Sequence, residues 1–112
     1  MSNKMRAGVI GVGAIGKNHA RIYSEIDTAE LVAVYDTDKE AAESMVSSYG
    51  GEVSNSIEEF IDLVDVVSIA TPTSTHRSIG EVLLNNNKHV LIEKPIADTT
   101  DDAQILVNLA AE

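Results

Sequence analysis

Three glycines near the start of the chain have the spacing that a dinucleotide diphosphate requires. The segment Gly11-Val12-Gly13-Ala14-Ile15-Gly16 follows a short apolar run and opens a stretch in which apolar residues recur at helical spacing. Asp36 follows Gly16 by 20 residues and ends a second apolar run. A glycine triplet alone is weak evidence. A triplet between strand and helix, followed by an acid at this distance, predicts a dinucleotide-binding site.

Each glycine of this segment has its own role in that interpretation. Gly11 allows a tight turn, Gly13 leaves the backbone open to the diphosphate, and Gly16 lets the helix pack closely on the strand. Ala14 and Ile15 begin the helix without a Ser, Thr, Asp or Asn cap, so a bound phosphate would supply the partners that the first amides lack. The alternative is a tight strand-to-helix turn that binds nothing.

Asp36 and the residues after it are expected to select the cofactor. The carboxylate would accept hydrogen bonds from the adenosine ribose and repel a 2′-phosphate, which favours NAD over NADP. Thr37 lies next to Asp36, and Lys39 is close enough in sequence to weaken the preference. The alternative is that Asp36 only makes a turn or caps the following helix.

The composition argues against several other classes of protein. The 112 residues include 8 basic and 18 acidic side chains, and the net charge of −10 argues against nucleic acid and anionic membranes as partners. There is no cysteine, which excludes disulfides and thiolate metal sites, and no spacing of His, Asp and Glu suggests a metal site. The N-terminal apolar run is too short for a signal peptide or a membrane span, so a cytoplasmic protein is expected.

Strand-like and helix-like segments alternate along the whole chain. The strand-like runs are continuous in Val, Ile and Leu, as expected where both faces of a sheet are covered. The alternation predicts a single α/β domain over residues 1–112 with a doubly wound parallel sheet, the Rossmann fold. The expected strands span residues 6–11, 30–36, 52–54, 65–70 and 89–93. The expected helices span residues 14–26 and 39–49, a brief segment from Ser56, a segment from 73–75 to about 87, and a last one from Thr99 or Thr100.

Apolar spacing also predicts which side of each helix faces the sheet. In the first helix the expected inner stripe contains Ile15, His19, Ile22 and Ile26, with His19 as a partly buried structural residue rather than a ligand. In the fourth helix Val82 is expected to face inward, together with its apolar neighbours.

Polar residues before two of the helices predict where those helices begin. Ser56 and Glu59 have the spacing of a capping box, in which the two residues satisfy each other's backbone amides. Thr73, Ser74 and Thr75 offer N-caps for the fourth helix.

Two further segments stand at predicted strand ends, where open parallel sheets bind their ligands. The first is Ala70-Thr71-Pro72-Thr73, with His76 behind it, and the second is Glu93-Lys94-Pro95. Together with the glycine segment and His19, these segments resemble the Gfo/Idh/MocA family, which includes glucose-fructose oxidoreductase and inositol 2-dehydrogenase. The Glu-Lys-Pro element after a strand is the most specific part, and the resemblance covers essentially the entire chain.

The resemblance implies a nicotinamide-dependent oxidoreductase. Such an enzyme transfers a hydride between NAD and a hydroxyl of a sugar, polyol or related small molecule. Lys94 matches the family's active-site lysine, which would polarise the substrate carbonyl or help to move the hydroxyl proton. The alternative, which the residues alone favour, is an exposed lysine at a strand end.

Other residues of these segments receive roles through the same resemblance. His76 would contact the cofactor or cap its helix. Pro95 would fix the turn that aims Lys94, and Glu93 would either orient Lys94 or be structural. The residues that would line the nicotinamide half of the cofactor are Ala70, Thr71, Pro72 and Thr73.

The family carries a second domain, with a substrate site and surfaces for a homo-oligomer, that has no counterpart in this sequence. The final helical pattern reaches Glu112 without a stop signal, so we expect a truncated cofactor domain that holds NAD but does not turn over substrate alone. An unpaired sheet edge and an uncovered apolar face should favour self-association. Two other functions stay open, a non-catalytic NAD-binding sensing or interaction module and a methyltransferase that uses S-adenosylmethionine.

Overall fold

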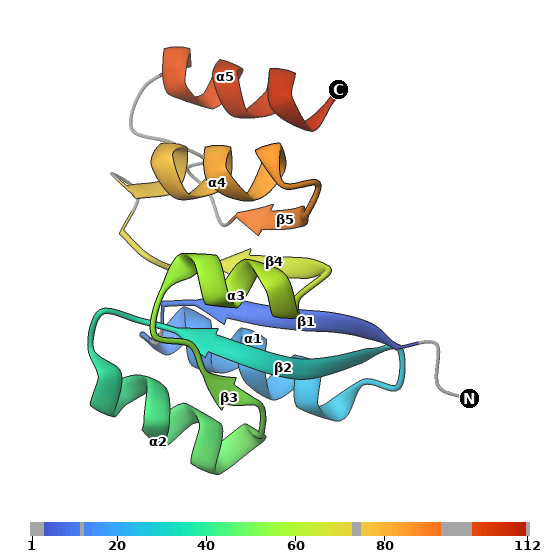
Figure 1. Ribbon diagram of the computed structural model, residues 1–112, viewed down its shortest axis with the longest axis vertical. Helices are drawn as coiled ribbons and strands as arrows, with labels where there is room; N and C mark the ends of the chain where they lie inside the picture. Colours follow the sequence, from blue (N-terminus) through green and yellow to red (C-terminus); the bar gives the residue numbers. More distant parts are fainter. Residues whose placement is uncertain (1–3, 12, 73–74, 93–99, 112) are drawn as a thin grey trace.

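In the part of the chain that the structure describes, five strands form one parallel sheet with helices on both faces (Figure 1). The computed structural model describes residues 4–11, 13–72, 75–92 and 100–111. Each strand ends within one residue of its predicted position. The strands are β1 (Met5–Ile10), β2 (Ala29–Tyr35), β3 (Glu52–Val53), β4 (Val66–Ile69) and β5 (His89–Ile92). The helices are α1 (Ala14–Glu25), α2 (Lys39–Tyr49), α3 (Ile57–Leu63), α4 (His76–Asn85) and α5 (Thr100–Ala110).

The strand order is β3-β2-β1-β4-β5, so the chain moves outward from β1 in two opposite directions. All neighbouring pairs are parallel. Such a sheet binds its ligand where the order reverses, beyond the carboxyl ends of β1 and β4. Gly11, Asp36 and Ala70 directly follow β1, β2 and β4, so these three predicted site segments leave the sheet at this one edge. The predicted doubly wound sheet is therefore confirmed.

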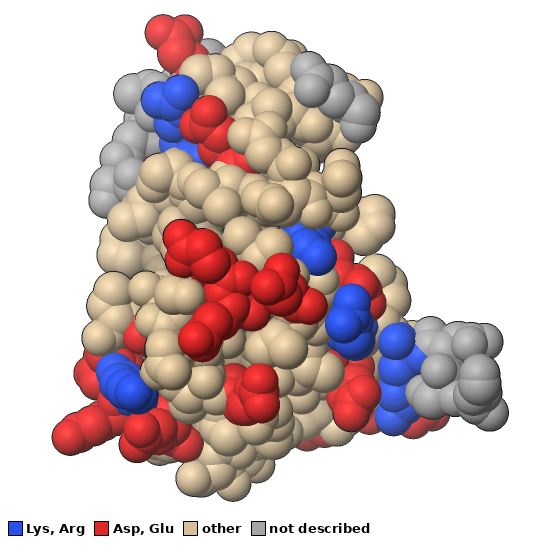
Figure 2. Space-filling view, in the orientation of Figure 1, with Lys and Arg blue, Asp and Glu red and all other residues tan. Residues whose placement is uncertain are grey.

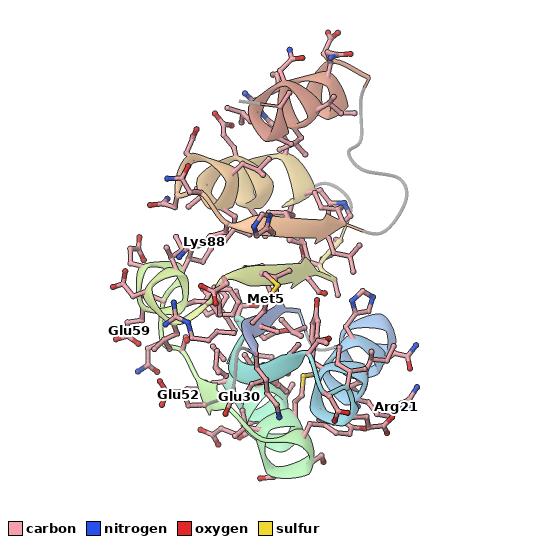
Figure 3. The ribbon with its side chains drawn as sticks, turned by 90° about the vertical axis from the view of Figure 1, so that its right-hand side faces the viewer. Met5, Arg21, Glu30, Glu52, Glu59 and Lys88 are labelled. Carbon is pink, nitrogen blue, oxygen red and sulfur yellow. The ribbon has the colours of Figure 1, made fainter. Side chains whose placement is uncertain are left out.

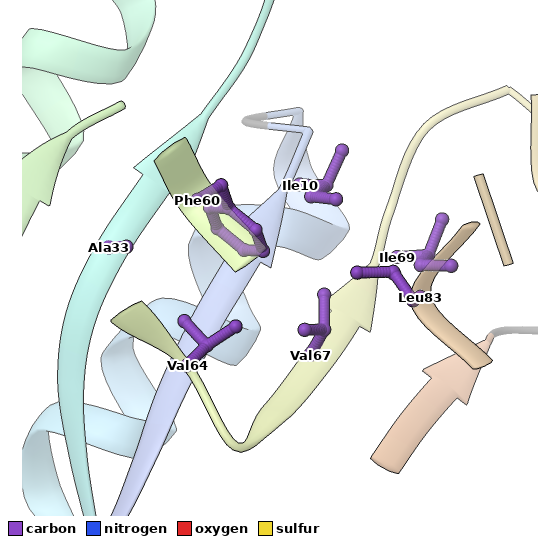
Figure 4. Close-up of a cluster of buried hydrophobic side chains, with 7 residues drawn as sticks. All are labelled: Ile10, Ala33, Phe60, Val64, Val67, Ile69 and Leu83. Carbon is purple, nitrogen blue, oxygen red and sulfur yellow. The ribbon is translucent and has the colours of Figure 1, made fainter. Parts of the chain in front are cut away.

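Each face of the sheet has its own apolar core. Val9 and Ile10 of β1 enter opposite cores, because successive side chains of a strand point to opposite faces. Figure 3 shows the layers from the side, with Arg21 of α1 and Glu59 of α3 pointing outward in opposite directions. The core under α1 and α2 contains Val9, Ala20, Leu31, Val34, Ala42 and Met45. The core under α3 and α4 contains Ile10, Ala33, Phe60, Val64, Val67, Ile69 and Leu83 (Figure 4).

The predicted inner faces of α1 and α4 are wrong in part. Ile22 and Ile26 are 43% and 40% exposed, because the turn of α1 places Ala20 in the core and packs Tyr23 against it. Val82 of α4 is 41% exposed. Apolar periodicity assigns polar residues and glycine to the outer face, whereas α4 buries one of each. The buried residues of α4 are His76, Gly80 and Leu83.

The capping box before α3 is confirmed with one difference. Ser56 Oγ accepts a hydrogen bond of 3.2 Å from the Glu59 amide. Glu59 Oε2 accepts one of 3.1 Å from the amide of Asn55, the residue before the cap, rather than from Ser56 itself. Both bonds satisfy amides that the short helix leaves without intrahelical partners.

The start of α4 agrees with the prediction, and its end differs. Thr75 is the N-cap residue, but its side chain does not cap the helix, because its Oγ1 donates to the carbonyl oxygen of Pro72 at 2.6 Å. The other two predicted caps, Thr73 and Ser74, lie outside the described residues. The helix ends at Asn85 rather than near residue 87. Asn87 has a φ of 61°, which turns the chain so that the Lys88 amide donates back to the Leu83 carbonyl.

Acidic side chains form a patch on the surface of α3. Figure 2 shows acidic side chains over α3, where Glu58, Glu59 and Asp62 are exposed. Arg6 joins the start of β1 to Asp65 before β4, with 3.0 Å between Nη2 and Oδ1. Hydrogen bonds from the Arg6 side chain, and then from its amide, hold the pKa of Asp65 below its usual value. None of the helices in the described part of the chain combines the length and hydropathy that a membrane span needs.

Candidate functional site

The turn after β1 requires glycine at position 11 for two reasons. Gly11 has a φ of +97°, a conformation that residues with a side chain rarely adopt. A Cβ there would also lie 2.7 Å from the backbone carbonyl atoms of Ala70. The Gly11 amide donates to the Tyr35 carbonyl oxygen at 2.9 Å, which ties the turn to β2. The glycine turn therefore contacts both strands that flank β1.

The first turn of α1 has free space beside Gly13 and close backbone packing beside Gly16. Gly13 is the N-cap residue, no side chain of the described residues caps this end, and the first turn contains no acidic residue. A Cβ on Gly13 would meet nothing within 4 Å, so space lies beside the helix amides. A Cβ on Gly16 would overlap the carbonyl oxygen of Gly11. Uncapped amides at the positive end of a helix, next to open space, form an arrangement that binds phosphate.

Asp36 forms a turn, which was the alternative to a role in ribose binding, and it also lines a cavity. Its Oδ1 accepts a hydrogen bond of 2.7 Å from the Asp38 amide. Asp38, rather than Asp36, caps α2 by accepting from the Ala41 amide at 3.2 Å. Asp36 is half-buried at the carboxyl end of β2. A turn formed by one oxygen fixes the direction of the whole carboxylate.

The cavity beside Asp36 has a volume of about 570 Å³ and lies beyond the ends of β2 and β3. Lys39 contributes a cation to its wall, so the wall holds both signs of charge. Among the described residues no partner is found for the buried Ser54 Oγ in the same wall. The residues that line the cavity are Tyr35, Asp36, Thr37, Lys39, Ser54 and Asn55.

His76 braces the loop that follows β4. The side chain is only 3% exposed, and its Nε2 lies 2.9 Å from the Thr71 carbonyl oxygen. Thr71 Oγ1 and Thr75 Oγ1 are 2.6 Å apart, and Thr75 Oγ1 donates to the carbonyl oxygen of Pro72. The loop therefore has several internal hydrogen bonds, and the predicted roles of His76 did not include this one.

The segment with the predicted catalytic lysine lies outside the described residues, and only the strand before it is placed. Thr73, Glu93, Lys94 and Pro95 lie outside the described residues. Ile69 pairs with Ile92, so β4 and β5 end side by side at the carboxyl edge of the sheet. Lys94 follows the end of β5 by two residues in sequence.

Sequence reasoning missed a polar cluster between α1 and β4. Ser68 is fully buried in the otherwise aliphatic strand β4. Its Oγ lies 2.8 Å from His19 Nδ1 and 2.7 Å from the Tyr23 hydroxyl oxygen. This agrees with the expectation that His19 is a partly buried structural residue. A single serine in a Val/Ile strand was the available signal, because a buried hydroxyl needs a partner.

Three features of this structure together define a class of protein. They are the doubly wound sheet, the glycine turn with an uncapped helix at the point where the strand order reverses, and the acidic residue after β2. The class is that of dinucleotide-binding Rossmann proteins. Residues 5–112 match a family model, GFO_IDH_MocA, described as an oxidoreductase family with an NAD-binding Rossmann fold. The chain belongs to this oxidoreductase family, as its sequence segments indicated.

Individual relatives agree with this assignment. Glucose-6-phosphate 3-dehydrogenase of Bacillus subtilis (strain 168) is 38% identical over 105 residues, covering 94% of this chain and 30% of the relative. Inositol 2-dehydrogenase of Rubrobacter xylanophilus is 37% identical over 114 residues, covering 99% of this chain and 33% of the relative. The structure of GenD2 from gentamicin A biosynthesis, in complex with NAD, superposes with a TM-score of 0.93 at 28% identity, covering 99% of this chain and 32% of that chain. The chain thus spans about a third of the length of these relatives.

Proposed function

We propose that the chain binds NAD as the cofactor domain of an oxidoreductase acting on a sugar, polyol or related hydroxy compound. The observation that carries the proposal is the uncapped start of α1. The helix start faces open space at Gly13, and Asp36 follows the end of β2, the strand next to β1. Family membership supports hydride transfer as the reaction of the whole protein.

The proposed cofactor lies across the carboxyl edge of the sheet. The first amides of α1 would hold the diphosphate, and Gly11 and Gly16 keep the helix close to β1. Asp36 would accept hydrogen bonds from the adenosine ribose. A 2′-phosphate at the same place would meet a carboxylate, which favours NAD over NADP. Lys39 lines the same cavity and would weaken this preference.

The chemical step is assigned to Lys94 through the family resemblance. When NAD is bound, its nicotinamide ring accepts or supplies the hydride. Lys94 would hold or move the proton of the substrate hydroxyl. Pro95 would fix the turn that orients the Lys94 side chain. Thr71 and Pro72 stand in the loop braced by His76 and would line the nicotinamide half.

A homo-oligomer is also part of the proposal. Among the described strands β5 lies at the edge of the sheet, and Leu91 on it is 50% exposed. Val107 of the neighbouring α5 is 51% exposed and lines the same apolar groove. An open edge beside exposed apolar side chains favours association of copies. The cytoplasmic location expected from the sequence stays a prediction.

A thermal-shift titration with NAD, NADP and S-adenosylmethionine tests the binding proposal. A ligand that binds only the folded chain stabilises it by about 2.7 kcal/mol at 100 times its Kd. We expect NAD to raise the melting temperature most, NADP less, and S-adenosylmethionine not at all. A shift with S-adenosylmethionine alone would instead favour a methyltransferase, and no shift with any ligand would contradict dinucleotide binding.

A further inference from the structure

A buried hydroxyl connects the phosphate-binding helix to the sheet. Ser68 of β4 has no exposed surface, and its Oγ is within hydrogen-bond distance of two side chains of α1. The distances are 2.8 Å to His19 Nδ1 and 2.7 Å to the Tyr23 hydroxyl oxygen. Ser68 has one hydroxyl hydrogen, so at least one of the two partners donates to it.

The two partners lie on one face of α1, one helical turn apart. His19 follows Gly16 by three residues and Tyr23 follows it by seven. The backbone contact between Gly16 and Gly11 fixes the start of the helix, and the bonds to Ser68 fix its middle. Two separate points of attachment determine both the tilt of the helix and its rotation about its own axis.

Apolar packing alone does not define this rotation as closely. Ala20, on the same helix, is buried against Val9 and Leu31, but the attraction between apolar surfaces is non-directional. Hydrogen bonds weaken steeply when the angle at the donor departs from linearity. The cluster therefore holds α1 in one rotation, which in turn sets where the amides near Gly13 point.

We infer that Ser68, His19 and Tyr23 position α1 for the diphosphate, with Ser68 as a positioning residue for a group it does not touch. This inference rests on the proposed binding of NAD. The ligand portion affected is the diphosphate, because only the diphosphate is held by α1. The adenosine portion is held at Asp36 and the cavity beyond β2, away from the cluster.

The test compares ligands with and without a diphosphate in the Ser68→Ala variant. Dissociation constants are measured by calorimetry for NAD and ADP-ribose, and by ligand-observed NMR for adenosine. Loss of the cluster is expected to weaken NAD and ADP-ribose roughly fivefold and to leave adenosine within about twofold. The matched control is Ser24→Ala, which removes an exposed hydroxyl of the same helix and leaves all three constants unchanged.

Three results overturn the inference. They are unchanged affinities in Ser68→Ala, an equal loss for all three ligands, and a diphosphate-specific loss in Ser24→Ala. If Ser68→Ala does not fold, Tyr23→Phe removes one bond of the cluster from a half-buried site and is expected to give the same pattern with a smaller loss. A wild-type chain that bound neither NAD nor ADP-ribose would overturn the proposed function, and this inference with it.

Discussion

The carbonyl oxygen of Gly11 fills the position that a β-carbon on Gly16 would need. The residue after β1 and the third residue of α1 are therefore in direct backbone contact. Gly13, between them in sequence, has open space on the corresponding side. The two glycines therefore differ, since a side chain at position 16 would disturb the packing of the helix on the strand, whereas one at position 13 would point into open space.

This contrast predicts opposite results for two alanine variants. Gly16→Ala forces the helix away from the strand and should cost roughly 2 kcal/mol of unfolding free energy. Gly13→Ala should change the unfolding free energy by about 0.5 kcal/mol or less. It should nevertheless weaken NAD about tenfold, equivalent to 1.4 kcal/mol, because the methyl group occupies the place of the phosphate. Urea denaturation and NAD titration measure the two quantities. Full NAD affinity in Gly13→Ala would argue that the diphosphate binds elsewhere.

Asp36→Ser is expected to weaken NAD and to reduce the discrimination against NADP. Loss of hydrogen bonds from ribose hydroxyls to a charged group should raise the Kd for NAD about tenfold. The ratio of NADP to NAD affinity should rise because the repelling carboxylate is gone. Asp38→Ser is the matched control, since it removes the same charge two residues away and leaves a residue that still caps α2. Equal NAD affinities in Asp36→Ser and wild type would remove Asp36 from the ribose site.

Lys94→Met should separate cofactor binding from chemistry. In the protein that carries the complete substrate site, turnover is expected to fall by about 10²–10⁴-fold, which is the typical contribution of a positioned acid or base. The Kd for NAD should stay within about twofold. Lys88→Met, an equal loss of charge before β5, serves as the control. Substantial turnover by Lys94→Met would refute its proposed role.

The Arg6–Asp65 pair should make stability depend on pH in the acid range. The pKa of Asp65 is lowered from its ordinary value near 3.8, mainly by hydrogen bonds from Arg6. A group with a lowered pKa stabilises the fold above its unfolded-state pKa, and this contribution is lost as the pH falls through the folded-state value. The melting temperature of Asp65→Asn should therefore lie below that of wild type at pH 7. The gap should close below about pH 4. Asp62→Asn, an exposed charge on α3, is the control, and a gap that persisted at low pH would contradict the assignment.

Leu91→Lys should reduce self-association of the chain. A charge on an edge strand opposes pairing with another edge, and Leu91 is half exposed at the edge of the sheet. Sedimentation velocity at increasing concentration should show association in wild type and less of it in the variant. Val82→Lys changes an exposed apolar residue of α4 and is expected to behave as wild type. Equal association by all three chains would place the interface elsewhere.

The features predicted well from the sequence are those encoded within a short stretch. Gly11 is placed by a local backbone conformation and Asp36 by the end of a strand, and both were found where expected. The cap at Ser56 depends on residues at most four positions apart. Such features do not depend on how distant segments pack, so a pattern of residue types is enough to identify them.

The features that were missed depend on contacts between distant segments. Ser68 meets His19 and Tyr23 across 49 and 45 residues, and a sequence without an alignment carries no sign of that pairing. Val82 was misplaced because Gly80 lies where α5 approaches, and a Cβ on Gly80 would come within 2.9 Å of Leu106. A glycine at a helix contact has no hydrophobicity that a periodic pattern can detect.

The acidic surface over α3 has a kinetic consequence. The chain carries a net charge of −10, and a dinucleotide is also an anion. The helix amides attract it only over the last few ångströms, so during diffusion the two molecules repel each other. Added salt shortens the range of that repulsion, with a Debye length of about 10 Å at 0.1 M. The encounter rate with NAD should therefore increase with ionic strength, whereas oppositely charged partners would meet more slowly under the same conditions.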